Sequence, residues 1–416
     1  MSSNHTQAES GERQTRVTPR LLLAPMEGVT DFATRLWLAQ TSRPDEATTP
    51  FLRVTKDYPS KRISANFLPE LELSKEHGIV PCVPQLMASE TGDLIRIAEH
   101  FLARVPFVDI NCGCPSPTVV GNGAGSSLLQ NPERFNRYLG EIVSALGPER
   151  VSVKMRVGFS NESEFPELLE VVKQFKLARL TIHGRTRADR YTGKARWFHI
   201  QNAAQNLPFP VVGSGDVVDA TSLDERLTEA PSIAGVMVGR GALRNPWVFS
   251  ELREPAAQQK RVINRALFRA TVLQFVLLQE MQMQCWDEFY RQVRDGFFGP
   301  ASAFAATPLD AANETLAARV FKGAASPSLA CEHWPISRVS LARGKMLWNY
   351  LRSGLNAPAV LSVALLRSSE WMQFVRALEN VLSSFPHDDM GLAYQPEWDW
   401  VYSGESAASL GGKVLT

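Results

Sequence analysis

Eight short apolar runs, each followed by a glycine-rich or polar turn and then by an amphipathic stretch, recur between residues 20 and 245. The first is RLLLAPMEG at 20–28 and the last is GVMVGRGAL at 235–243. Near-continuous apolar strands that alternate with helices are typical of a parallel sheet covered on both faces. Eight consecutive units favour closure over an open doubly wound sheet, so the sequence predicts an α/β fold, a (β/α)8 TIM barrel.

The pattern changes after Pro246. Residues 247–282 and 338–386 have helical periodicity and predict a C-terminal all-α domain, whereas residues 295–328 are rich in Ala, Gly and Pro and predict a long loop or insertion. The predicted division is a disordered tail at 1–19, a barrel at 20–246, a helical domain at 247–390 with an insertion around 284–335, and a tail at 391–416.

Charge and cysteine content limit the class of protein. The 44 Lys and Arg residues nearly balance 43 Asp and Glu residues, so any nucleic-acid surface must be a local patch. Five cysteines are too few for a disulfide framework and favour a reducing, cytoplasmic compartment. Cys112 and Cys114 have no second pair to complete a metal site. We expect no secretory signal and no membrane span, because no apolar stretch approaches about 20 residues.

Polar residues follow the apolar runs, where the active sites of such barrels lie. The turns after runs seven and eight contain glycines and Arg240, which suits a phosphate group. No dinucleotide fingerprint is present, and flavin mononucleotide (FMN) would use these groups, with Gln85 at the pyrimidine edge of its ring and Lys154 near N1 and O2. The strand-end residues predicted to bind it are Pro25, Met26, Glu27, Gly28, Gln85, Lys154, His183, Ser214, Gly215, Asp216, Gly239 and Arg240.

Five motifs carry a family resemblance. APMEGVTD (24–31), NCGCPSP (111–117), SVKMRVG (152–158), TIHGRT (181–186) and VMVGRGAL (236–243), in this order, resemble the tRNA-dihydrouridine synthases. The stretches FLRV at 51–54 and ARGKMLWNYLR at 342–352 resemble the C-type bacterial branch, which modifies uridine 16 of the tRNA D-loop. The resemblance implies an FMN barrel, a helical tRNA-binding domain and electrons from NADPH, or NADH.

The implied reaction reduces the 5,6 double bond of a D-loop uridine. Hydride passes from FMN to C6, and a cysteine that matches Cys114 protonates C5, while Cys112 has no matching role and is expected to pack in the core. An acid must hold its proton, so Cys114 needs a thiol pKa that is not depressed. The residues implied to contact tRNA are Arg53, Asn111, Tyr191, Arg343, Lys345, Tyr350 and Arg367.

Several alternatives remain open at the level of sequence. Asn111 could instead form an Asx turn before Gly113, and the basic segment 335–376 could be a solvated helix face. Ser214 stands where related enzymes commonly have Asn. A small-molecule FMN oxidoreductase and a catalytically silent tRNA-binding protein are the other functions considered. We expect a monomer without a metal ion.

Overall fold

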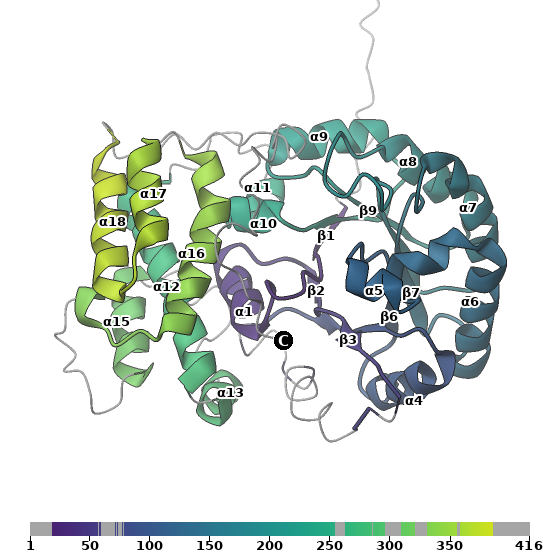
Figure 1. The fold of residues 1–416 in the computed structure, drawn as a ribbon, viewed down its shortest axis with the longest axis horizontal. Helices are drawn as coiled ribbons and strands as arrows, with labels where there is room; N and C mark the ends of the chain where they lie inside the picture. The colour runs from purple at the N-terminus through teal and green to yellow at the C-terminus, as the bar shows by residue number, and fades with distance from the viewer. Residues whose placement is uncertain are drawn as a thin grey trace, which may run out of the picture.

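The computed structural model describes residues 19–253, 263–295, 309–320 and 331–385, except 57, 60–70, 72, 74–76, 78, 285, 356 and 357. Residues 1–18 of the predicted N-terminal tail, the whole predicted C-terminal tail and parts of the predicted insertion lie outside the described residues. Figure 1 shows a curled sheet surrounded by helices and, beside it, a group of packed helices that carries the last described residues.

All strand pairs of the sheet are parallel, in the order β3-β5-β6-β7-β8-β9-β10-β1-β2-β4. Each of the eight apolar runs contains a strand, and the second and third runs contain two each. The strands are β1 (Arg20–Leu23), β2 (Glu46–Thr48), β3 (Leu52–Arg53), β4 (Cys82–Val83), β5 (Gln85–Met87), β6 (Val108–Cys112), β7 (Val151–Arg156), β8 (Arg179–His183), β9 (Val211–Ser214) and β10 (Gly235–Val238).

Two prolines interrupt the strands of the second and third apolar runs. Pro50 lies between β2 and β3, and Pro84 lies between β4 and β5. Proline has no backbone N–H, so each run is divided into two short strands. β2 pairs with β4 and β3 pairs with β5, which joins the two ends of the strand order into a ring. The predicted TIM barrel is therefore confirmed.

Helices cover the outside of the barrel (Figure 1). Their apolar faces pack on the strands, as at Ile97, Phe135 and Leu168, which are all fully or almost fully buried. α6 begins after Asn131, whose side chain accepts a hydrogen bond from the Arg134 N–H. The barrel helices are α1 (Phe32–Thr41), α4 (Thr91–Leu102), α5 (Pro117–Gly121), α6 (Pro132–Leu146), α7 (Phe165–Lys173), α8 (Trp197–Asn206), α9 (Ala220–Glu229) and α10 (Gly241–Arg244), with 3-10 helices at Gly125–Gln130 and Glu162–Glu164.

The C-terminal helices pack around α12, which is buried along most of its length. α12 contacts α15, α16 and α18, and on its other side it contacts α1 of the barrel. The indole N–H of Trp37 on α1 donates to the carbonyl of Thr271 on α12 at 3.0 Å. The helices are α11 (Val248–Arg253), α12 (Arg265–Gln284), α13 (Trp286–Arg294), α15 (Leu309–Val320), α16 (Arg338–Leu351), α17 (Ala359–Arg367) and α18 (Trp371–Ser383), with 3-10 helices at Cys331–His333 and Arg352–Gly354.

Helix α15 lies where the composition of residues 295–328 predicts a long loop, and there the structure differs from the expectation. Leu316 is fully buried, and the side-chain amide of Asn313 donates to the Ala270 carbonyl at 2.9 Å. Glycine and proline at the flanks of this segment suggested a loop, but its alanine-rich middle has high helix propensity and packs on α12. Among the described helices, none combines the length and apolar character that a membrane crossing requires.

Candidate active site

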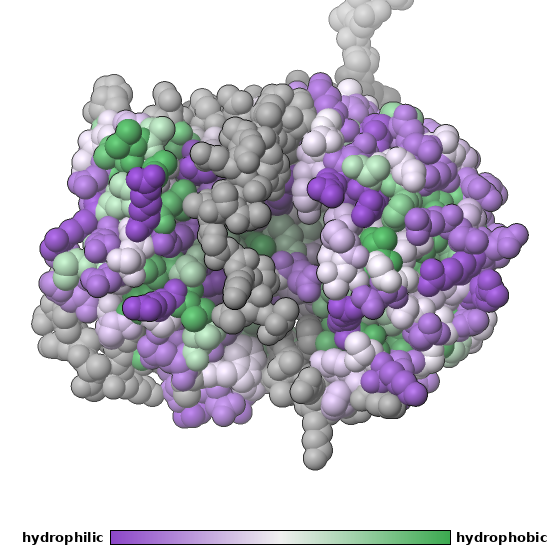
Figure 2. All heavy atoms as spheres, viewed as in Figure 1, coloured by the Kyte–Doolittle hydropathy of each residue, from purple (hydrophilic) through white to green (hydrophobic). Residues whose placement is uncertain are grey.

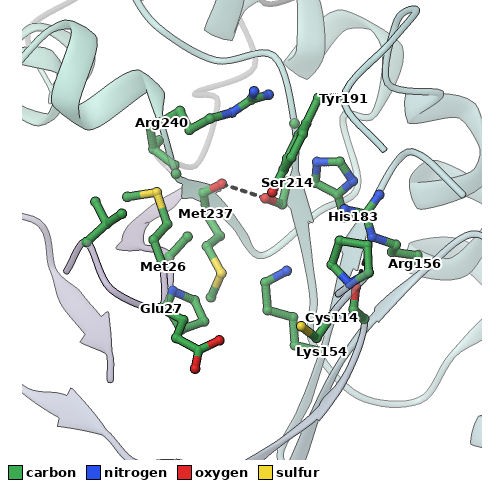
Figure 3. Close-up of a pocket in the computed structure, with 18 of the residues that line it drawn as sticks. Met26, Glu27, Cys114, Lys154, Arg156, His183, Tyr191, Ser214, Met237 and Arg240 are labelled. Atoms are coloured by element: carbon green, nitrogen blue, oxygen red, sulfur yellow. Dashed lines mark hydrogen bonds between the residues drawn. The ribbon is translucent and has the colours of Figure 1, made fainter. Parts of the chain in front are cut away.

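A cavity of about 370 Å³ opens at the C-terminal ends of the barrel strands. Figure 2 shows the surface hollowed between the barrel and the helical domain, and Figure 3 shows side chains converging on the cavity from several strands. Most of the predicted site residues line it. They are Pro25, Met26, Glu27, Asn111, Cys114, Lys154, Tyr191, His183, Ser214, Gly215, Asp216, Gly239, Arg240 and Tyr350.

The strand register explains why residues from three motifs meet. Asn111 of β6 lies beside Lys154 of β7, and His183 of β8 lies between Arg156 of β7 and Ser214 of β9. Lys154 and Arg156 are two residues apart, so their side chains leave the strand on the same face. Local sequence therefore places these groups at one rim, and parallel pairing brings them together.

Cys114 is held by its own loop. Its backbone N–H donates to the Asn111 side-chain oxygen at 2.9 Å, and its carbonyl accepts from the Ser126 hydroxyl at 2.7 Å. The Gly113 N–H donates to the same Asn111 oxygen at 3.0 Å. The Asx turn considered for Asn111 is therefore present, and its acceptor is fully used. Cys114 still lines the cavity, directly beside Lys154 in Figure 3.

The two cysteines of this motif differ in environment. Cys112 is completely buried in the apolar core, as expected. Burial raises the pKa of the Cys114 thiol, and the hydrogen bond from the Ser116 backbone N–H, together with the charges of Arg156 and Lys154, offsets this only in part. The Cys114 thiol consequently keeps its proton at neutral pH, which is the state that a general acid requires.

Cationic groups crowd the floor of the cavity. Burial, with help from Arg156, lowers the pKa of Lys154 to about 8, and burial lowers the pKa of Arg156 to about 10. Burial and these same cations hold the pKa of His183 well below its usual range, so its imidazole is neutral. Its Nδ1 is buried and, among the described residues, has no hydrogen-bond partner. Lys154, Arg156 and the unused ring nitrogen suit a ligand that is rich in acceptors and carries negative charge.

Arg156 is a site residue that the sequence predictions omitted. Its guanidinium donates to the Gly113 carbonyl at 2.9 Å and to the carbonyls of Thr186 and Arg190 at 2.8 and 3.1 Å. It therefore joins the loop that carries Cys114 to the loop that carries Tyr191. The available signal was its position in SVKMRVG, two residues after Lys154 and thus on the same strand face.

The turns after β9 and β10 form another wall of the cavity. Gly215 has φ of +123°, and a Cβ there would lie 2.7 Å from the Ala195 Cβ, so only glycine fits. The Ser214 hydroxyl donates to the Met237 carbonyl at 2.9 Å (Figure 3). The Arg240 guanidinium lies over the Tyr191 ring, 3.9 Å from its centroid. The stacked pair borders the cavity on this side.

The side chains of Asp216 and Gln85 are engaged in contacts within the protein. The Asp216 carboxylate is fully buried, ion-paired with Arg185 at 2.6 Å, and accepts from the Ala195 N–H at 2.6 Å. Gln85 is also fully buried, is absent from the cavity lining, and donates to Asp109 at 2.7 Å. Gly28 does not line the cavity either, and its carbonyl accepts from Arg343.

The predicted tRNA contacts separate into two groups. Arg53 and Arg367 are exposed, and Tyr350 of α16 reaches the cavity wall. Arg343, in contrast, donates to the Val29 carbonyl and to Asp31, both at 2.8 Å, and so connects α16 to the first loop of the barrel. The Lys345 ammonium donates to the Ser368 carbonyl at 2.6 Å.

Two further observations concern the basic segment and metal binding. Trp348, which has helical spacing within the basic segment, is fully buried and packs in the core. Among the described residues, no group of three or more His, Cys, Asp or Glu side chains could hold a metal ion.

Comparisons with known proteins agree with the motifs. A tRNA-dihydrouridine(16) synthase of Cupriavidus necator is 34% identical over 238 residues, which is 56% of this chain and 73% of that protein. A tRNA-dihydrouridine(47) synthase of Coprinopsis cinerea is 32% identical over 48% of this chain and 29% of its own. Among solved structures, the old yellow enzyme from Trypanosoma cruzi covers 57% of this chain and 88% of its own, with a TM-score of 0.39 and 10% identity. The model of the dihydrouridine synthase (Dus) family matches residues 22–309, from β1 through the barrel into the helical region, and the chain belongs to this family.

Proposed function

We propose that the protein reduces a uridine in tRNA to dihydrouridine, with FMN as its flavin and NADPH or NADH as electron donor. The observation that carries this proposal is the cavity itself, whose lining includes both the Cys114 thiol, with its raised pKa, and the Lys154 side chain. Membership of the dihydrouridine synthase family supports the reaction. The names of the related proteins support tRNA as the substrate.

The residues at the cavity fit a flavin mononucleotide. Such a ligand has an acceptor-rich planar ring and a phosphate, and the cavity offers Lys154 and the unused Nδ1 of His183. Gly239 also lines the cavity, next to Met26. We assign the phosphate to the turns at Gly215 and Gly239 with Arg240, and the ring to the side of Lys154. When bound, the flavin supplies the hydride for C6 of the pyrimidine.

The protein supplies the proton and the charge stabilisation. The Cys114 thiol gives its proton to C5, and water returns a proton to the thiolate afterwards. Lys154 would stabilise negative charge on the ring of a bound flavin. Asn111 and Tyr191 hold the pyrimidine in the cavity.

Access to the base requires the tRNA to unstack it and turn it into the barrel. That rearrangement costs a few kcal/mol, which contacts elsewhere on the RNA must provide. Arg53 and Arg367 are exposed cations suited to phosphate contacts, and Tyr350 extends the cavity wall towards the helical domain. Because α16 belongs to that domain, RNA docked on the helices would lie next to the cavity.

Uridine 16 is the proposed target. It is supported by the relatives from Cupriavidus necator and Escherichia coli O157:H7, each a tRNA-dihydrouridine(16) synthase 34% identical to this chain. The relative from Coprinopsis cinerea, named for position 47, supplies the competing site.

Purified protein loaded with FMN, incubated with NADPH and unmodified tRNA, tests the proposal. Mass spectrometry of nuclease fragments should locate dihydrouridine at position 16. Dihydrouridine at position 47 alone would refute the site, and a protein that cannot be loaded with flavin would refute the chemistry.

A further inference from the structure

A chain of buried polar side chains lies beneath the Cys114 loop. The Ser152 hydroxyl donates to one Asp109 oxygen at 2.5 Å, and the Gln85 side-chain NH2 donates to the other at 2.7 Å. The Asn111 side-chain NH2 donates to the Gln85 oxygen at 2.8 Å. Asp109, Gln85 and Ser152 are fully buried, and Asn111 is 8% exposed where it lines the cavity.

The donor-to-acceptor direction of the hydrogen bonds in this network has one physical origin. An ionised carboxylate accepts hydrogen bonds and donates none, whereas a carboxamide does both at opposite ends. Asp109 therefore requires the NH2 end of Gln85, which turns the Gln85 oxygen towards Asn111. That oxygen in turn requires the NH2 end of Asn111, and the Asn111 oxygen is left to face the N–H groups of Gly113 and Cys114.

We propose that Asp109 is a positioning residue whose carboxylate sets the orientation of both amides and thereby the geometry of the active-site loop. Asn111 then fixes Cys114 with its oxygen and keeps one N–H for the cavity. A pyrimidine carbonyl is the group that this N–H recognises. The recognition step rests on the proposed function, but the anchoring of the loop does not.

A carboxylate at position 109 fixes the direction of these hydrogen bonds, whereas a carboxamide would not. A carboxamide at 109 could turn either end towards Gln85, because the Ser152 hydroxyl can donate or accept. In Asp109→Asn the two amides consequently lose their fixed direction. The loop is then held correctly in only part of the population, since the reversed direction sets the Asn111 NH2 against two N–H donors.

Two double variants move the carboxylate from position 109 to position 85 or position 111 without changing the net charge. In Asp109→Asn/Gln85→Glu, the new carboxylate accepts from Asn111, so the original direction returns. In Asp109→Asn/Asn111→Asp, the carboxylate accepts from Gly113 and Cys114, so the loop is anchored but no N–H faces the pyrimidine. Ser152→Ala is the matched control, because it leaves the Asp109 acceptor for Gln85 in place.

The first measurement is alkylation of Cys114 by iodoacetamide in the FMN-loaded protein without tRNA, followed by peptide mass spectrometry and corrected for the thiol pKa found in the same pH series. In Asp109→Asn the Cys114 thiol should react about fivefold faster, because the free energy of about one net hydrogen bond corresponds to about this factor. Both double variants and Ser152→Ala should react at the wild-type rate. An unchanged rate in Asp109→Asn, or a fast rate in either double variant, would overturn the proposal.

The second measurement is tRNA reduction. Asp109→Asn/Gln85→Glu should regain the wild-type KM for tRNA, and Asp109→Asn/Asn111→Asp should lose about tenfold or more in kcat/KM despite its anchored loop. Equal activity of the two double variants would contradict the assigned N–H. If Asp109→Asn does not fold, the double variants still decide the matter, because an unfolded Asp109→Asn/Gln85→Glu overturns the proposal. If neither the wild type nor any variant forms dihydrouridine, the proposed function is wrong. The alkylation rates still test whether Asp109 positions the Cys114 loop.

Discussion

At the scale of single residues, the cavity gives two neighbouring groups different protonation properties. Burial raises the pKa of Cys114 above its ordinary value and lowers that of Lys154 to about 8. Both shifts disfavour the charged form of a buried group, so they have one cause and opposite directions. The thiol thus remains protonated over a pH range in which the ammonium loses its charge.

The decrease in kcat/KM at alkaline pH should therefore result from deprotonation of Lys154. Lys154 is charged below its pKa, so kcat/KM should fall as the pH rises through about 8. Lys154→Arg keeps its charge at these pH values and should move the fall to higher pH. The measurement is tRNA reduction between pH 6.5 and 10, with tRNA binding followed separately. A fall at the same pH in both proteins would show that another group is responsible.

At the scale of elements, the segment between β8 and α8 is held over the cavity by a buried ion pair. Arg185 and Asp216 are both fully buried, and Arg185 also donates to the Gly193 carbonyl. Asp216 accepts from Ala195 at the far end of the same segment. The pair therefore fixes both arms of the loop on which Tyr191 lies.

Removal of one partner leaves a buried charge without compensation. Asp216→Asn should lower the free energy of unfolding by about 3 kcal/mol and expose residues 187–194 to limited proteolysis. Glu170→Gln, which removes a solvent-exposed ion pair with Lys173 on α7, is the control and should change neither quantity measurably. Thermal unfolding and proteolysis of the FMN-loaded proteins check this. Equal stability of the two variants would exclude the structural role of Asp216.

At the scale of the whole molecule, Arg343 connects the C-terminal helices to the barrel. It lies on α16 and contacts the loop that precedes α1, while Tyr350 on the same helix reaches the cavity. The family resemblance assigned Arg343 to tRNA, but in the structure its guanidinium is occupied within the protein. Arg367 is exposed at the end of α17.

The two arginines should therefore behave differently. Arg343→Ala should lower the free energy of unfolding by about 2 kcal/mol, because it removes hydrogen bonds to backbone carbonyls and to Asp31. Arg367→Ala should leave stability unchanged, weaken tRNA binding and reduce the salt dependence of binding by about one counterion. Thermal unfolding and binding titrations at several salt concentrations measure both effects. Identical behaviour of the two variants would contradict this assignment.

Sequence reasoning predicted the features that depend on residues close together in the sequence. The period of the strands placed Lys154, His183 and Cys114 at one rim, and parallel pairing made them neighbours. It did not predict partners that arrive from distant segments. Asp109 accepts a hydrogen bond from the Gln85 amide, which does not line the cavity, and Asp31 in the first barrel loop pairs with Arg343 of α16. Composition likewise hid α15, whose stability depends on packing against α12.

The central claim is that Cys114 donates the proton that completes uracil reduction. The most direct test reduces the FMN-loaded protein anaerobically, mixes it with unmodified tRNA, and follows flavin oxidation and dihydrouridine in one turnover. Cys114→Ala should bind and reduce flavin normally but form dihydrouridine at least about 100-fold more slowly, whereas Cys112→Ala should react like the wild type. Wild-type rates in Cys114→Ala would contradict the account.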